Sequence, residues 1–189
     1  ASGKDDLVPD FVASSLGVPA DVESTFGGDS LEILGAGARL RIQNEFTDNV
    51  TIDDLRLSGG TVEFVDSEGS LNLAGALTLR QDSGIDVRGA FNTLVLDSSV
   101  SGSGTLTVTA SATTLDEDET LIINGDNSGF DGGWNFVGGR TFASSDGALG
   151  SGDILLNNAN LEIDSNIESP DAGLIIQGNS ILSLFKDAT

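Results

Sequence analysis

The stretch from Asn124 to Gly133, NGDNSGFDGG, gathers side chains that are able to bind a hard cation. Asp126, Ser128 and Asp131 offer oxygen ligands in a flexible turn, the donor type that calcium prefers. The EF-hand pattern needs a Glu at its twelfth position, and counting from Asn124 that position holds Asn135. The Gly-Gly-x-Gly-x-Asp repeat of calcium-binding β-rolls is also absent. We therefore expect a solvated turn without a cofactor, and calcium near Asp126 and Asp131 is the alternative.

Acidic residues elsewhere suggest a second chemistry. Asp82, Asp86 and Asp97 would line one face of a sheet, and paired carboxylates are the groups that glycosidases use. No cluster of Lys and Arg accompanies them in the sequence, and the short turns supply no walls for a cleft. Trp134, the single tryptophan, would be a platform for a sugar ring or a core residue. We predict that the protein is not an enzyme, with a carbohydrate-binding or polysaccharide-cleaving protein as the alternative.

Composition excludes several classes of function. Eight Lys and Arg against thirty Asp and Glu give a net charge of −22, which opposes binding to nucleic acid or to an anionic membrane. Cys, Met, His and Tyr are all absent, which removes disulfides, Cys-based zinc sites, thiol nucleophiles and imidazole bases. A hydrophobic fraction of 38% is too high for a disordered acidic polymer, and no apolar stretch reaches the ~20 residues of a membrane span.

Short pairs of the form apolar-x-apolar follow one another from Leu31 onward, separated by Gly, Ser, Asn or Asp. This period of two predicts short strands with one buried face. The first members of the pairs recur about every 22 residues in three series, which are Leu55, Leu77, Val100 and Leu121, then Val62, Ile85 and Leu106, and finally Leu71, Leu94 and Leu115. The series are preceded at a similar offset by Leu31, Leu40 and Val50.

A repeat of this size predicts an all-β fold, a parallel β-helix (β-solenoid) with three short strands per coil of about 22 residues. Three strands and three turns carry the chain once around and return it one strand spacing, about 4.8 Å, further on. An antiparallel sandwich is the competing fold, but it gives no reason for residues 22 apart to match. We expect the β-helix over residues 30–189, after a non-repetitive N-terminal cap or assembly segment at 1–29 that holds a short helix from about Pro9 to Leu16.

Acidic and amide residues near the expected turns are interpreted as structural. The acidic run DEDE, Asp116 to Glu119, is expected to be a surface cluster at a corner of a coil. Asparagine tolerates left-handed backbone angles, so a turn position is expected for Asn44, Asn49, Asn72, Asn92, Asn124, Asn157, Asn158 and Asn160.

The segments NGDNSGFDGGWNFVGGRTF, from Asn124, and ALGSGDILLNNANLEI, to Ile163, resemble the autotransporter-associated β-strand repeat of secreted and surface passenger proteins of bacteria. The resemblance covers about a fifth of the chain, and the step Ala-Leu-Gly-Ser-Gly is its most specific part. It implies a right-handed parallel β-helix on an exported protein. It also implies that Trp134 lies on a strand, which favours burial of this residue. Arg140 departs from the family pattern. The positions that follow the pattern are Phe130, Gly132, Gly133, Trp134, Phe136, Gly139, Ala148, Leu149, Gly150, Gly152, Ile154, Leu156, Asn157, Asn158, Leu161 and Ile163.

We predict a structural function for this chain, as a stalk, an adhesin segment or a self-assembling filament or matrix subunit, extracellular or on the bacterial cell surface. The ends of a β-helix are unpaired strand edges, so assembly is expected there. Its partners would be a second copy stacked end to end, neighbouring segments of a longer surface protein, or surface glycans. The capping or assembly candidates are Phe11, Val12 and Leu16 near the N-terminus, and Ile181, Leu182, Leu184 and Phe185 in the last expected strand.

Overall fold

The computed structural model describes residues 22–26, 30–42, 48–65, 69–88, 92–110, 120–164 and 172–184, and these contain β-strands and turns but no helix. None of these residues therefore forms a helix that would span a membrane. Several predictions concern residues outside this set, namely the helix from Pro9 to Leu16, the acidic run Asp116–Glu119, and the individual residues Phe11, Val12, Asn44, Leu115 and Phe185.

The strands in the described residues are β1 (Val22–Phe26), β2 (Leu31–Leu34), β3 (Arg39–Ile42), β4 (Asp48–Ser58), β5 (Thr61–Val65), β6 (Gly69–Gln81), β7 (Ser83–Arg88), β8 (Asn92–Leu96), β9 (Ser99–Gly102), β10 (Leu106–Ala110), β11 (Thr120–Ile123), β12 (Trp134–Val137), β13 (Arg140–Ala143), β14 (Ile154–Asn157), β15 (Asn160–Ile163), β16 (Leu174–Gln177) and β17 (Ile181–Leu184). β1 lies within the segment 1–29 and pairs in parallel with β4.

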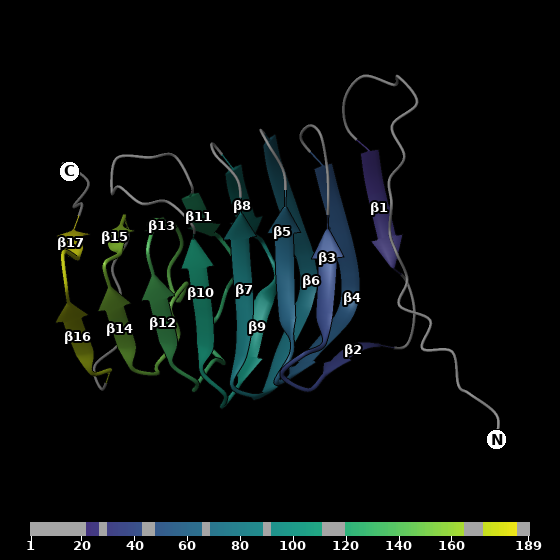
Figure 1. Cartoon of the computed structure of the whole chain (residues 1–189), viewed down its shortest axis with the longest axis horizontal. Coiled ribbons are helices and arrows are strands. Elements are labelled where there is room, and N and C mark those ends of the chain that lie inside the picture. The colour runs from purple at the N-terminus through teal and green to yellow at the C-terminus, as the bar shows by residue number, and fades with distance from the viewer. Residues whose placement is uncertain are drawn as a thin grey trace.

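The strands form two sheets in which successive coils pair in parallel. One sheet runs β1-β4-β6-β8-β11-β13-β15-β17, with β2 on β4 and β9 on β6, and the other runs β16-β14-β12-β10-β7-β5-β3. Figure 1 shows the resulting ladder, with β1 to β3 at one end and β16 and β17 at the other. The all-β parallel β-solenoid predicted from the repeat is confirmed, and parallel pairing between coils excludes the antiparallel sandwich.

Apolar side chains from alternate positions fill one continuous core between the sheets. Leu106 and Val108 of β10 are buried, whereas Thr107 between them faces outward and is partly exposed. Burial of an aliphatic side chain contributes about 1.5–3 kcal/mol. The few such side chains of a single coil do not offset the conformational entropy that the coil loses when it becomes ordered. The coils therefore stabilise one another as a stack.

The predicted columns that the register confirms are Leu31–Leu55–Leu77–Val100, Leu40–Val62–Ile85 and Leu71–Leu94.

Two of the three predicted strands per coil are fused into one bent strand in β4 and in β6. The bend falls at Gly75, where the register between β4 and β6 shifts at Ile52. Gly75 has a φ of 109°, and a Cβ there would overlap the carbonyl oxygen of Ile52. Only glycine combines this backbone angle with so close an approach of the neighbouring coil. The bend lets one strand cover two sides of the coil.

The predicted register is wrong at two places toward the C-terminal end and at one near the N-terminal end. Leu121 pairs with Leu94, 27 positions earlier, and not with Val100. Ile85 pairs with Val108 rather than Leu106. Near the other end, Val50 pairs with Leu73 rather than Leu71. For Ile85 and Val50 the difference is a shift of two residues, which preserves which side chains face inward. Leu121 differs in another way, because its strand pairs with β8 rather than with β9.

The C-terminal coils contain two strands rather than the predicted three, with a step of 20 residues from Trp134 to Ile154 and from Ile154 to Leu174. In the described residues the third side is a turn at 124–133 and at 144–153, where the buried Phe130, Ala148 and Leu149 replace a strand in filling the core. Asn158 adopts the left-handed angle expected at a turn, with a φ of 50°. Asn49 and Asn72, which were expected at or near turns, lie inside β4 and β6.

Candidate functional site

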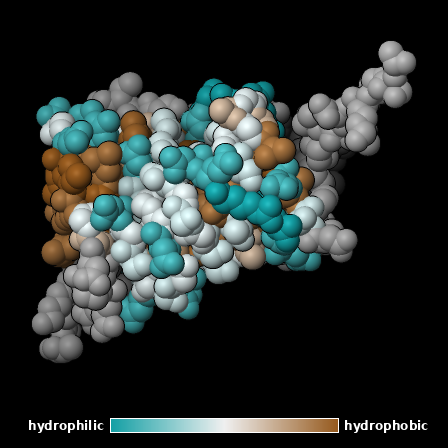
Figure 2. Space-filling view, turned by 90° about the horizontal axis from the view of Figure 1, so that it is seen from below, coloured by the Kyte–Doolittle hydropathy of each residue, from teal (hydrophilic) through white to brown (hydrophobic). Residues whose placement is uncertain are grey.

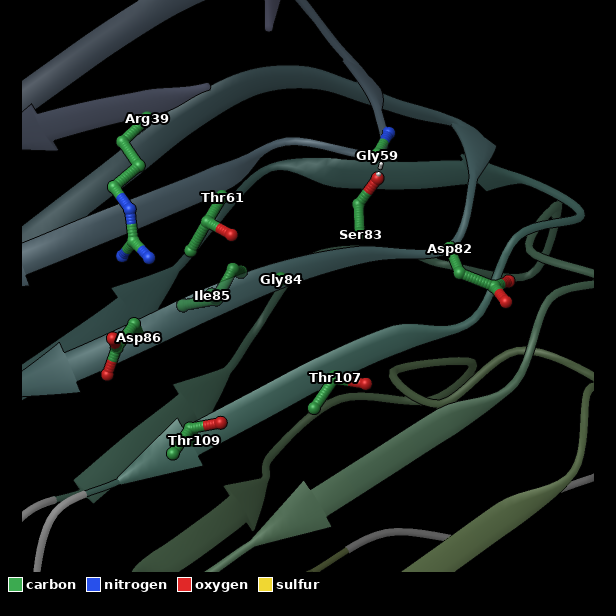
Figure 3. A pocket seen from close by; sticks show the side chains of 10 residues that line it. All are labelled: Arg39, Gly59, Thr61, Asp82, Ser83, Gly84, Ile85, Asp86, Thr107 and Thr109. Carbon is green, nitrogen blue, oxygen red and sulfur yellow. Dashed lines mark hydrogen bonds between the residues drawn. The ribbon is translucent and has the colours of Figure 1, made fainter. Parts of the chain in front are cut away.

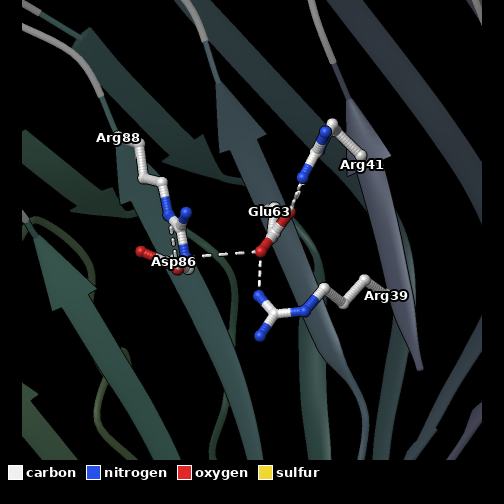
Figure 4. Close-up of polar contacts among 5 residues, drawn as sticks. All are labelled: Arg39, Arg41, Glu63, Asp86 and Arg88. Atoms are coloured by element: carbon white, nitrogen blue, oxygen red, sulfur yellow. Dashed lines mark hydrogen bonds and ion pairs between the residues drawn. The ribbon is translucent and has the colours of Figure 1, made fainter. Parts of the chain in front are cut away.

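Glu63 lies on β5 beneath three arginines on the outer face of the seven-stranded sheet (Figure 4). Its side chain is only 1% exposed. One carboxylate oxygen accepts hydrogen bonds from Nε and Nη2 of Arg41 at 3.0 and 2.9 Å. The other pairs with Arg39 and lies 3.4 Å from Nη2 of Arg88, which also pairs with Asp86. We call Arg39, Arg41, Glu63, Asp86 and Arg88 the Glu63 cluster.

The Glu63 cluster connects three neighbouring strands. Arg41 of β3 and Asp86 of β7 are the direct neighbours of Glu63 in the parallel register. The hydrogen bond and the charge of Asp86 raise the pKa of Arg88 above its usual value. Three guanidinium groups against two carboxylates leave one net positive charge in a chain whose net charge is −22. The cluster is therefore a positively charged site on a protein whose net charge is negative.

A shallow groove of ≈ 340 Å³ lies beside the Glu63 cluster on the same face (Figure 3). Its lining residues are Arg39, Gly59, Thr61, Asp82, Ser83, Gly84, Ile85, Asp86, Thr107 and Thr109. Gly84 leaves space between two threonines, because a Cβ there would approach Thr61 Oγ1 to 3.2 Å. The groove therefore offers hydroxyl groups, with Arg39 toward one end and Asp82 toward the other (Figure 3).

The structure brings together two of the three acids that the sequence grouped. Asp82 and Asp86 both line the groove, whereas Asp97 follows β8 in the other sheet. Asp82 accepts a hydrogen bond from the backbone N–H of Thr105 at 2.8 Å, and Asp86 is held by Arg88. Both acids therefore have structural partners.

The sequence did not reveal the cations at this site. Arg39 lines the groove, and Arg88 lies in the Glu63 cluster beside Asp86, although the sequence shows no Lys/Arg-rich catalytic constellation around the acids. The signal was the repeat offset itself, because Glu63 stands 22 residues after Arg41 and 23 before Asp86. Arg140 also pairs with an acid of the next coil, since its Nη2 lies 2.6 Å from Glu162 Oε2, although its direct neighbour in the register is Asn160.

The carboxylates of the alternative calcium site take part in separate turn contacts. Asp126 Oδ1 accepts a hydrogen bond from the backbone N–H of Ser128 at 3.0 Å, and this bond lowers the pKa of Asp126. Asp131 Oδ1 accepts a hydrogen bond from Ser151 Oγ at 3.2 Å. Within the part of the chain that the structure describes, no group of three acidic side chains is placed to hold a metal ion. These contacts give no support for calcium binding.

Trp134 is a core residue, as its place on a strand predicted. Its ring is stacked on Phe136 at 5.5 Å between centroids and meets Phe130 edge-on at 5.4 Å. The indole N–H donates to the carbonyl oxygen of Leu149 at 2.9 Å. With only 1% of its surface exposed, Trp134 is inaccessible to a sugar.

Asn127 is a buried polar residue that the sequence did not single out. It is fully buried, and its Oδ1 accepts a hydrogen bond from the backbone N–H of Val100 at 2.6 Å. Its Nδ2 donates to the carbonyl oxygen of Ala148, also at 2.6 Å. One side chain thus joins three successive coils on the side where the C-terminal coils have a turn in place of a strand.

The last coil exposes a group of apolar side chains that we call the C-terminal face, formed by Leu174, Ile175, Ile176, Ile181, Leu182 and Leu184. It contains the predicted assembly candidates Ile181, Leu182 and Leu184. The exposed fractions of Ile176 and Leu184 are 49% and 73%. Figure 2 shows these apolar surfaces gathered at the left end of the molecule, where Figure 1 places β16 and β17.

The N-terminal end differs from the C-terminal face. Its inward-facing residues Ile33, Leu40 and Ile42 are buried, at 8%, 5% and 7% exposure. Its edge strand β3 carries Arg39 and Arg41, both held by Glu63. In contrast, residues 172–184 contain no charged side chain.

No protein-family model, curated protein or solved structure matches this chain. The functional argument therefore rests on the geometry of the solenoid and its surfaces. The relationship to the autotransporter-associated repeat stays a prediction from the sequence.

Proposed function

We propose that this protein is a non-catalytic structural protein of the bacterial surface or extracellular space, acting as a rigid β-solenoid rod. The observation that supports this proposal is the parallel ladder, which carries one apolar core from β2 to β15. Each coil contacts its neighbours through backbone hydrogen bonds and packed side chains, so bending the rod would break many contacts at once. A rod that holds its two ends at a fixed distance requires this resistance to bending.

The outer surface suits an exposed structural role. A net charge of −22 keeps such rods soluble and apart, and the absence of Cys avoids wrong disulfides during export. The resemblance of residues 124–163 to a repeat of bacterial passenger proteins supports the same location. Together these features favour a secreted or cell-surface protein that serves as a stalk, an adhesin segment or a matrix subunit.

Cellular location provides the direct test of this function. Antibodies against the purified chain would be used on intact source cells, with and without external protease, and on fractionated cells. We expect the antigen at the surface or in the medium, and its loss after protease treatment of intact cells. An antigen confined to the cytoplasm, together with an intact cytoplasmic control protein, would contradict the proposal.

Glycan binding is a second candidate function, favoured by the hydroxyl-lined groove over Gly84. Its volume suits a single sugar unit, and Thr61, Thr107 and Arg39 supply hydrogen-bonding groups. Calorimetric titration with neutral and acidic oligosaccharides tests it, together with an assay for new reducing ends.

The groove is filled in a Gly84→Val variant, whereas a Gly37→Ala variant adds a methyl group where no atom lies within 4 Å. We expect any binding to be lost in the first variant and kept in the second. Binding that survives Gly84→Val would exclude the groove, and the appearance of reducing ends would replace the non-catalytic proposal with an enzymatic one.

A further inference from the structure

We propose that the C-terminal face docks onto the C-terminal face of a second copy, which closes the solenoid as a two-fold symmetric dimer. This inference rests on the proposed structural role and names a partner for it. Two properties of the last coil suggest a partner: its strands have unpaired edges, and its inward-facing side chains are uncovered.

The unpaired edges belong to β16 and β17. Among the described residues, β16 pairs with β14 alone and β17 with β15 alone, so each offers a free row of backbone N–H and C=O groups. Soluble proteins usually protect such edges with charged side chains. β3, at the other end of its sheet, carries Arg39 and Arg41, but residues 172–184 carry no charge. The sequence of the last coil thus permits pairing with a further strand.

The uncovered side chains define the shape of the partner. Leu174 and Ile176 of β16 and Leu184 of β17 continue the core columns of the preceding coil, yet they are 44%, 49% and 73% exposed. A partner must present two strand edges at the spacing of the two sheets, with apolar side chains between them. The C-terminal face of another copy presents two strand edges at the same spacing, because the two chains are identical.

Charge and symmetry decide which end of the second copy docks. Contact between two uncharged C-terminal faces avoids placing acidic groups against each other, which matters for a chain of net charge −22. The N-terminal end is less suitable, because Leu40 and Ile42 are already buried and β3 is charged. A contact that uses the same surface on both copies is isologous and closes as a dimer, whereas a head-to-tail contact would propagate into a filament.

Sedimentation velocity over a hundredfold range of protein concentration tests the dimer. The test variant is Leu184→Lys, and the matched control is Leu34→Lys, because Leu34 is a 70% exposed leucine near the N-terminal end. We expect the unmodified chain and the control to dimerise, and the test variant to show at least a tenfold higher dissociation constant. Circular dichroism would confirm that both variants are folded.

Disulfide trapping distinguishes the orientation, because the chain has no cysteine. Ser183→Cys and Ile175→Cys place one thiol on each strand of the C-terminal face, and Ala36→Cys places one near the other end. Oxidation is expected to give a covalent dimer of at least one C-terminal variant, suppressed by Leu184→Lys, but none of Ala36→Cys. Sedimenting filaments that both lysine variants weaken would overturn the dimer in favour of head-to-tail stacking.

A chain that stays monomeric throughout would also overturn the dimer, and the open coil would then be left for other β-strands. Neither a filament nor a monomer would contradict the proposed structural role, which the cellular-location experiment tests separately. Loss of surface location with a persistent dimer would reject the role and retain the contact.

Discussion

At the scale of single residues, most polar side chains of this solenoid act between coils rather than within them. Asn127 and Glu63 are the two most buried examples, and each joins three strands or turns that are more than 20 positions apart in sequence. Their partners belong to neighbouring coils, so each substitution is expected to weaken the stack and not a local turn.

Replacing Asn127 by Leu should destabilise the protein by about 2–4 kcal/mol. The change removes two hydrogen bonds and leaves the N–H of Val100 and the carbonyl of Ala148 buried without partners. The free energy of unfolding would be measured by urea titration. As a control, the exposed Asn124→Leu change should cost under about 0.5 kcal/mol, and an equal loss in both variants would contradict the assigned role of Asn127.

Replacing Glu63 by Gln should cost about 1–3 kcal/mol, because the three arginines lose a buried anion but keep access to water. The control is Asp54→Asn, which removes the partner of Arg56 where both side chains are partly exposed. This second change should cost less than about 1 kcal/mol. Thermal unfolding at low and at high salt would compare the two, and a smaller effect of the Glu63 substitution would show that the cluster is not stabilising.

At the scale of elements, the conformation that the sequence least predicted is the bend in β6. Gly75→Ala should destabilise the protein by about 2–4 kcal/mol, because alanine is strained at φ 109° and its Cβ would overlap Ile52 of the adjacent coil. Gly37→Ala, in open space, is the control. Urea titration measures both variants. Equal stability of the Gly75 variant and the original chain would mean that the bend does not need glycine.

Strand positions could be predicted from the sequence, because only a buried face requires apolar residues at every second position. The offset between Leu71 and Leu94, or Leu55 and Leu77, identified the parallel pairing for the same reason. The register at Val50 and Ile85 could not be derived, since a two-residue shift preserves burial. The Glu63 cluster was missed because outward-facing polar residues follow no periodic requirement.

At the scale of the whole molecule, the stack is expected to unfold as one cooperative unit through its shared core. Trp134 is the only tryptophan and there is no tyrosine, so its fluorescence reports on the C-terminal coils alone. Leu71→Ala, at a fully buried position of an earlier coil, should cost about 2–5 kcal/mol. The midpoint of Trp134 fluorescence and that of circular dichroism should fall together. An unchanged fluorescence midpoint beside a biphasic circular dichroism curve would show that the coils melt separately.

The even step of the C-terminal coils has a consequence for how such a chain changes over generations. Trp134, Ile154 and Leu174 occupy equivalent places at intervals of 20 residues. An in-frame deletion of residues 134–153 would bring Ile154 beside Leu106, leaving the inward and outward alternation unbroken. A duplication of the same residues would add one coil to the rod. Gene rearrangement can therefore alter the length of the rod in increments of about 4.8 Å while every remaining coil keeps an equivalent neighbour.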